Sequence, residues 1–283
     1  MFQNVTIGQD QPQAQYVLTL SNDTGVSQAF KISTEDFGSL NQSGGVAFLG
    51  TSSSGYAQTY GLSKWMQLSQ TAVTLAAGAS TNIFVTITNS SSLATGGHYG
   101  AVLATALTAP NGAAAKSRIG VLEVLSSLLL LVKSGGPPPN LTLLAQTVDR
   151  QGILFPSQVQ QLFKNQGDVH VVPRGTIDIR DPLGHLVARG AMNINSGIIL
   201  PQTARRYDVS LMQLASAWMP GEYSVLTTYR YDGSNATKTW TGQFWYFGSP
   251  LLWLLVAAVL LLAAAIIWWF RRHPLRLRLR LRR

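Results

Sequence analysis

Three residues in one short segment, Asp178, Asp181 and His185, are of the types that bind divalent metal ions. Carboxylates and imidazole suit such ions, and a metal site would support hydrolysis or solute sensing. The local pattern favours a simpler interpretation. Asp178 lies in a run typical of a strand, and Asp181-Pro182-Leu183-Gly184 is typical of a turn in which Asp binds backbone amides. We therefore expect no metal and no cofactor here, and a metal-dependent enzyme or solute sensor stays an alternative that requires the three side chains to converge.

Other motifs that could support catalysis lack the companion motifs that such chemistry needs. Asp36-Phe37-Gly38 matches the magnesium-binding tripeptide of kinases, but no glycine-rich loop or His-Arg-Asp catalytic loop accompanies it. The chain has no cysteine, which excludes disulfides, thiolate metal sites and cysteine nucleophiles. The glutamates are Glu35, Glu123 and Glu222, and paired-carboxylate hydrolysis is poorly supplied. We expect no catalytic residues, so the protein is predicted not to be an enzyme.

A long apolar segment lies near the C-terminus. Leu251 to Phe270 contains no charged residue, and twenty residues of helix span about 30 Å, the thickness of a bilayer core. Trp268 and Trp269 stand at its end, followed by Arg271 and Arg272. Aromatic residues also gather at its beginning: Trp240, Trp245, Tyr246, Phe247 and Trp253. The pattern predicts a transmembrane helix over 251–270 with aromatic belts in both interfaces.

The charge distribution predicts the orientation of this helix. The formal charge is +9, but residues 271–283 hold seven arginines and no acidic residue. This tail is expected to stay in the cytoplasm, as a stop-transfer anchor or as a strand lying on anionic lipid, with the N-terminal domains extracellular. Export would need a signal peptide upstream of Met1. The alternative is a tail-anchored protein whose large domain stays in the cytoplasm. The remaining residues are nearly neutral, so no nucleic-acid partner is expected.

Most of the chain before the helix alternates between apolar and other residues with a period of two. Examples are Tyr16 to Leu20, Ile83 to Ile87, Tyr99 to Leu103 and Tyr223 to Tyr231. Short alternating runs bounded by Gly, Ser and Asn predict antiparallel sandwiches. The apolar run Ile119 to Val132 is predicted to be the buried last strand of a first domain. No segment before residue 250 shows a helical period.

The segment from Ser134 to Pro139 contains two glycines and three prolines, and is typical of a semi-rigid spacer. It divides the chain into two predicted immunoglobulin-like β-sandwiches, an all-β fold followed by one helix. The predicted units are a first sandwich (1–133), a linker (134–139), a membrane-proximal sandwich (140–247), the transmembrane helix (251–270) and an arginine-rich tail (271–283). Whether the first sandwich contains its opening strand is left open.

Several strand and turn signatures resemble a known family. In the first half they are Trp65 to Leu68, Val73 to Gly78, Ile83 to Ile87 and Gly96 to Ala101. In the second half they are Phe163 to Val171, Gly175 to Ile177, Leu200-Pro201, Arg205-Arg206 and Gly221 to Tyr223. Together they resemble bacterial cell-surface proteins related to the WxL-interacting (DUF916-type) family. The resemblance implies immunoglobulin-like domains and carries over no catalytic residue.

These observations predict a non-catalytic cell-surface protein that binds or scaffolds at the cell envelope, for instance in adhesion. Its partners would be the lipid bilayer and a surface protein, a wall polymer or a host-cell ligand. The alternative to this role is a subunit of a surface assembly, formed when an open sheet edge accepts a strand from a partner. Six glycosylation sequons begin at Asn4, Asn22, Asn41, Asn89, Asn140 and Asn235, and we interpret them as chance products of a Ser/Thr-rich chain.

Overall fold

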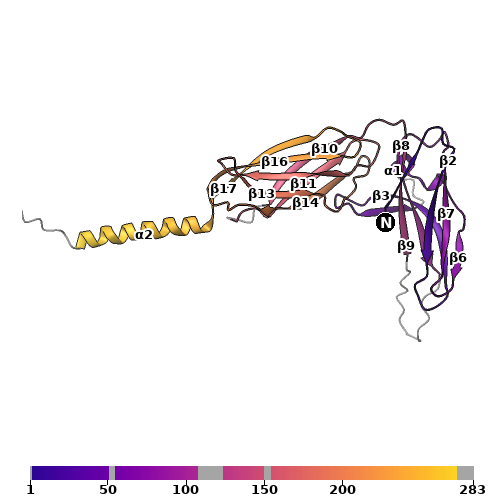
Figure 1. Ribbon diagram of the computed structural model, residues 1–283, viewed down its shortest axis with the longest axis horizontal. Helices are drawn as coiled ribbons and strands as arrows, with labels where there is room; N and C mark the ends of the chain where they lie inside the picture. The colour runs from indigo at the N-terminus through magenta and orange to yellow at the C-terminus, as the bar shows by residue number, and fades with distance from the viewer. Residues whose placement is uncertain (1, 51–54, 108–123, 150–153, 273–283) are drawn as a thin grey trace, which may run out of the picture.

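The computed structural model describes residues 2–50, 55–107, 124–149 and 154–272. It shows two β-sandwiches in chain order and then one apolar helix (Figure 1). This confirms the predicted fold class, two immunoglobulin-like sandwiches followed by a helix. The strands of the first sandwich run crosswise to those of the second, and the helix projects from the far end of the second (Figure 1).

The first sandwich packs a large sheet against a small one. The large sheet has the order β1-β9-β8-β3-β4, with β6 also paired to β3. Its strands are β1 (Phe2–Ile7), β9 (Val124–Lys133), β8 (Gly96–Ala106), β3 (Gln28–Ser39), β4 (Val46–Gly50) and β6 (Ala72–Leu75). The small sheet has the order β2-β7-β5, with β2 (Gln13–Ser21), β7 (Ser80–Thr88) and β5 (Met66–Leu68). The side chains that the two sheets bury between them form the core of this sandwich.

The apolar run of β9 is explained by burial on both faces. Leu129 and Leu131 point into the core between the sheets, whereas Leu128 and Leu130 belong to a second cluster on the opposite face of the same sheet. Strands covered on both sides lose the usual alternation. The prediction of a buried last strand is confirmed over Leu128 to Leu131, but Val124 to Ser126 are exposed, so it was wrong for the start of β9. Residues 119–123 lie outside the described residues.

Two short helical segments lie before residue 250, in a part of the chain whose sequence shows no helical period. They are α1 (Gly55–Tyr60) and the 3₁₀ turn η1 (Ser63–Trp65). Six residues are too few to show a helical period in sequence. Tyr60 of α1 is buried against β8, and the carboxylate of Asp36 accepts hydrogen bonds from the amides of Leu62 and Ser63, both at 2.7 Å. Tertiary packing and this cap stabilise the segment.

The second sandwich pairs a three-stranded sheet with a five-stranded one. The smaller sheet has the order β10-β11-β14, with β10 (Leu141–Asp149), β11 (Gln158–Asn165) and β14 (Ala204–Ser210). The larger has the order β15-β13-β12-β16-β17, with β15 (Met212–Gln213), β13 (Leu186–Met192), β12 (Pro173–Arg180), β16 (Gly221–Tyr231) and β17 (Lys238–Tyr246). The predicted hairpin is present as β12 and β13, and Tyr223, Val225, Thr227, Tyr229 and Tyr231 of β16 all face inward as expected.

The last element, α2 (Pro250–Arg272), contains the predicted apolar segment. None of its most apolar stretch is buried against the two sandwiches, so its side chains face outward on every side. Its length and composition are sufficient to cross a membrane. One part of the predicted aromatic belt was wrong. Tyr246 is buried in the second core beside Tyr223, and Trp240 packs against the same core, so neither belongs to the helix end.

Candidate functional site

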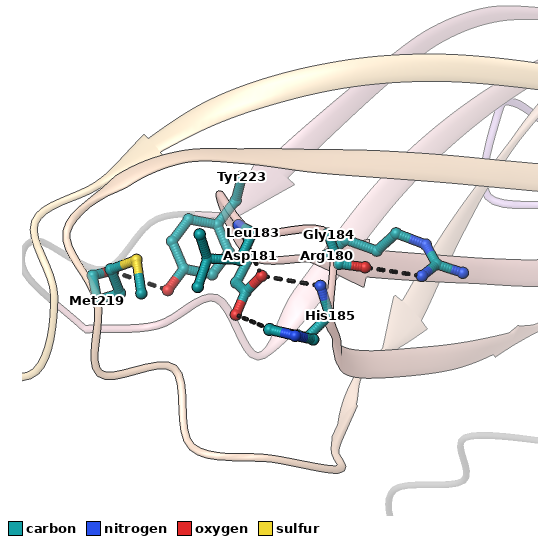
Figure 2. A network of polar contacts seen from close by, with 7 residues as sticks. All are labelled: Arg180, Asp181, Leu183, Gly184, His185, Met219 and Tyr223. Carbon is teal, nitrogen blue, oxygen red and sulfur yellow. Dashed lines mark hydrogen bonds and ion pairs between the residues drawn. The ribbon is translucent and has the colours of Figure 1, made fainter.

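The three candidate metal ligands do not converge. Asp178 on β12 binds the guanidinium of Arg189 on β13, with Oδ1 2.6 Å from Nε and Oδ2 2.8 Å from Nη2. Asp181 caps the β12–β13 turn instead: its Oδ1 accepts the amides of Leu183 (2.9 Å) and His185 (2.8 Å), and its Oδ2 lies 3.2 Å from Nδ1 of His185 (Figure 2). Each carboxylate has a structural partner, and the described residues contain no cluster of three metal ligands.

This geometry leads to a first prediction. Replacing Asp178, Asp181 and His185 together with alanine should lower the urea midpoint only modestly, because one turn cap and one ion pair with the exposed Arg189 are lost. Urea unfolding of the variant measures this. Partner binding should persist, also in a chelator. An unchanged fold with no binding would show that the three side chains form a functional site.

The kinase-like tripeptide has a structural explanation. Asp36 is the cap of η1 already described, and Phe37 is buried in the cluster that lies between the two domains, 5.9 Å from the ring of Tyr99. Two of the sequon asparagines are structural as well. The side-chain amide of Asn22 donates to three carbonyls and is buried, and that of Asn89 donates to Gly8, Gln9 and Gln11. The buried amide of Asn22 is not accessible for glycan attachment in this fold, and the amide of Asn89 is held by three backbone carbonyls.

The strongest candidate site is a cleft at one edge of the first sandwich. The described pairing of β1 with β9 is parallel and runs from Phe2–Leu128 to Ile7–Lys133. Residues Val124 to Ser127 of β9 pair with β8 on one side of the strand. On their other side lies no strand within the described residues. Here the gap between the sheets opens as a cleft of about 320 Å³. We call it the β9 cleft; β2, β3, β7, β8 and β9 line it.

The walls of the β9 cleft are formed partly by residues of the core of the sandwich. Ile32, Ile83, Val102 and Ala104 line it, and all four belong to the first hydrophobic core. Leu125 pairs with Ala104 in register and therefore points to the same inner face. Leu125 is nevertheless 46% exposed, whereas Leu129, four residues along the same face, is fully buried beneath the part of the edge that β1 covers. Leu125 is therefore an inward-facing apolar side chain that is accessible from the β9 cleft.

The strand β1 shows what kind of segment fits this edge. Its residues alternate between exposed and more buried positions, and Val5 and Ile7 pack against the core. Its backbone pairs with β9, which supplies affinity independently of side-chain identity. A second extended segment, with apolar side chains at alternate positions, would occupy the β9 cleft in the same manner.

The two sandwiches are joined by hydrogen bonds and by an apolar contact. The backbone oxygen of Asp168 accepts the amide of Gly97 (2.7 Å), and its carboxylate accepts the hydroxyl of Tyr60 (2.9 Å). The amide of His170 donates to the hydroxyl of Tyr99 (2.8 Å). Leu200 of the second sandwich packs into the cluster on the outer face of β8 and β9. These contacts fix the sandwiches to each other, and hence the β9 cleft to the second sandwich.

Neither the β9 cleft nor the junction can be located from the sequence pattern. His170 precedes β12, and its ring lies 5.8 Å from that of Tyr99 in the other sandwich. The open edge was considered as a consequence of a missing first strand, whereas the structure places β1 beside part of β9. The exposed, apolar start of β9 was the available signal.

No protein-family model matches the sequence, and no curated protein matches it. The resemblance to the WxL-interacting family therefore gains no support. Similar solved structures are pilus chaperones. The class 5 fimbriae chaperone CfaA has a TM-score of 0.43 at 11% identity, over 84% of this chain and 94% of that one. Pseudomonas aeruginosa CupB2 chaperone has a TM-score of 0.37 at 10% identity, over 86% and 97%. A structure of the Salmonella enterica SafA pilin with its SafB chaperone has a TM-score of 0.40 at 10% identity, over 86% and 92%.

Proposed function

We propose that this chain is a non-catalytic, membrane-anchored protein of the cell envelope whose first sandwich accepts an extended strand from another protein at the β9 cleft. The observation that carries the proposal is the β9 cleft itself, an opening of about 320 Å³ between the two sheets that is lined by core residues and by the inward-facing, 46% exposed Leu125. An apolar cleft beside a sheet edge suits an extended strand that places apolar side chains at alternate positions. A chaperone with a pilin is among the similar structures, but the proposal rests on the cleft of this chain.

The anchor is α2, placed across the membrane with its C-terminal end in the cytoplasm. Trp253 and Trp268 stand near the two ends of the apolar segment 251–270, whose twenty residues span about 30 Å of helix, the thickness of a bilayer core. The guanidinium of Arg272 lies 4.2 Å from the centre of the Trp268 ring, so the first basic residues and the aromatic belt are at the same depth. The tail beyond residue 272 lies outside the described residues.

The experiment that tests the proposal compares two neighbouring residues of β9. Their side chains are similarly exposed but point to opposite faces of the sheet. Leu125 lines the β9 cleft at 46% exposed, while Val124 faces outward at 48% exposed and does not line it. The full chain in nanodiscs is used to select short displayed peptides. Selected peptides should carry apolar residues at alternate positions. Leu125→Asp should abolish their binding, because a charge enters the site of the apolar side chains, and the matched Val124→Asp should retain it.

Two outcomes would overturn the proposal: no enrichment of alternating apolar peptides, or equal binding by both aspartate variants. The related candidate is a subunit that adds strands to its own copies, which the same cleft favours. It predicts concentration-dependent oligomers of the purified chain that Leu125→Asp dissolves and Val124→Asp does not. Monomers at all concentrations, together with peptide binding, favour a foreign partner.

A further inference from the structure

A group of exposed apolar side chains lies on the end of the second sandwich from which α2 emerges. It consists of Leu183 in the β12–β13 turn, Leu214 and Trp218 between β15 and β16, and Trp245 and Phe247 at the end of β17; each is between 47% and 66% exposed. We call this group the apolar collar. Exposed tryptophan and leucine side chains that gather at one end of a domain mark an interaction surface.

The members of the collar are held together by the packing of this end. The hydroxyl of Tyr223 on β16 donates to the carbonyl of Met219, which precedes β16, and the capped turn with Leu183 lies beside it (Figure 2). The amide of Leu214 donates to the carbonyl of Val187 at the start of β13 (2.8 Å). The loops that carry Leu183, Leu214 and Trp218 therefore occupy one end of the sheet.

The connection from the collar to α2 is short and hydrogen-bonded. β17 ends at Tyr246 and α2 begins at Pro250. The amide of Ser249 donates to the carbonyl of Trp218 (3.3 Å), and the indole of Trp253 donates to the carbonyl of Phe247 (2.6 Å). Gly248 takes a positive φ of 83°, which lets the chain turn sharply from strand to helix. The start of the helix is thus tied to the collar at two points.

We infer that the apolar collar is a lipid-contacting surface that sits at the headgroup and acyl boundary of the bilayer. The inference extends the proposed function, since it requires α2 to be the anchor. Trp253 lies in the first turn of α2 and belongs to the interfacial belt of a spanning helix. Because Ser249, only four residues earlier, binds the loop of Trp218, that loop lies at nearly the same depth. Tryptophan suits this environment, since its ring is apolar and its N–H needs a polar partner.

The polar groups beside the collar fit a headgroup region. Arg180 donates to the carbonyl of Gly184 in the β12–β13 turn, and exposed His185 follows that turn (Figure 2). The carboxylate of Asp181 is occupied by the amides of Leu183 and His185, so it is not directed at lipid phosphate. The collar would hold the second sandwich against the membrane at a fixed tilt. Through the contacts at the junction between the domains it would also set the height of the β9 cleft.

The test exploits the absence of cysteine in this chain. Single cysteines at Leu183, Ile194 and Leu260 are labelled with an environment-sensitive fluorophore in the full chain, reconstituted in nanodiscs of phosphatidylcholine and phosphatidylglycerol. Ile194 is the matched control: it is an exposed apolar residue (78%) in the loop that begins opposite Pro173, at the other end of the second sandwich. Leu260 reports on the middle of α2.

The label at Leu183→Cys should show blue-shifted emission and several-fold weaker quenching by aqueous iodide than the label at Ile194→Cys. Adding Trp218→Ser should largely remove this protection, and Trp218→Phe should keep it. Equal quenching at positions 183 and 194 overturns the inference even when the label at 260 is protected. A water-exposed label at 260 overturns the anchor itself. Protection at 183 in detergent that grows with protein concentration identifies a second copy as the occupant and also overturns the inference.

Discussion

Replacing Gly175 with alanine is expected to lower the free energy of unfolding of the second sandwich by on the order of 3 kcal/mol. Gly175 lies on β12 opposite Tyr229 of β16. A Cβ at this position would contact the backbone carbonyl of Thr228 and lie 2.8 Å from the Cα of Tyr229. Both obstacles are backbone atoms of a central strand, so relief requires the two strands to separate.

The matched control is Gly25→Ala. A Cβ at Gly25 meets no atom within 4 Å, and its backbone is not in the left-handed region. Urea unfolding of both variants should show a large drop in midpoint for Gly175→Ala and a small change for Gly25→Ala. Similar midpoints for the two variants would mean that β12 and β16 tolerate a wider separation than the packing indicates.

Acid is expected to destabilise the protein through His170. Burial lowers the pKa of His170 from 6.5 to about 4, an effect that Asp232 opposes in part. Between these two values the unfolded chain binds a proton that the folded protein excludes. Stability is therefore retained above pH 6.5 and lost as the pH falls from about 6.5 towards 4, by up to about 3 kcal/mol.

The loss should fall on the junction between the domains. The Nδ1 of His170 lies 3.4 Å from the hydroxyl of Tyr99, and its amide donates to the same hydroxyl. A charged imidazole would have to leave this contact to reach water. His170→Asn should reduce the stability difference between pH 7 and pH 4.5 in urea unfolding. His185→Asn, at a histidine whose side chain is 71% exposed, should leave it unchanged. An unaltered pH dependence in His170→Asn contradicts the assignment.

The sequence was sufficient for the elements that have a strong local pattern. The run of twenty apolar residues predicts a helix that is separate from the two sandwiches. α2 indeed lies outside both of them. The period of two placed Tyr223, Val225, Thr227, Tyr229 and Tyr231 on one face of β16. Asp181 was recognised as a turn residue because Asp and Pro have strong local preferences at such positions.

Tertiary structure decided which of these faces are covered, and by what. Alternation shows that Leu125 and Leu129 share a face, but only the partial pairing of β1 with β9 leaves the first exposed and buries the second. Trp240 and Tyr246 have the composition of an interfacial belt, yet they belong to the second core, while Leu183 and Trp218, far apart in sequence, lie beside the helix end. The contact of His170 with Tyr99 joins residues 71 positions apart. Residue types set what a side chain prefers as its environment, and long-range strand pairing sets which environment it receives.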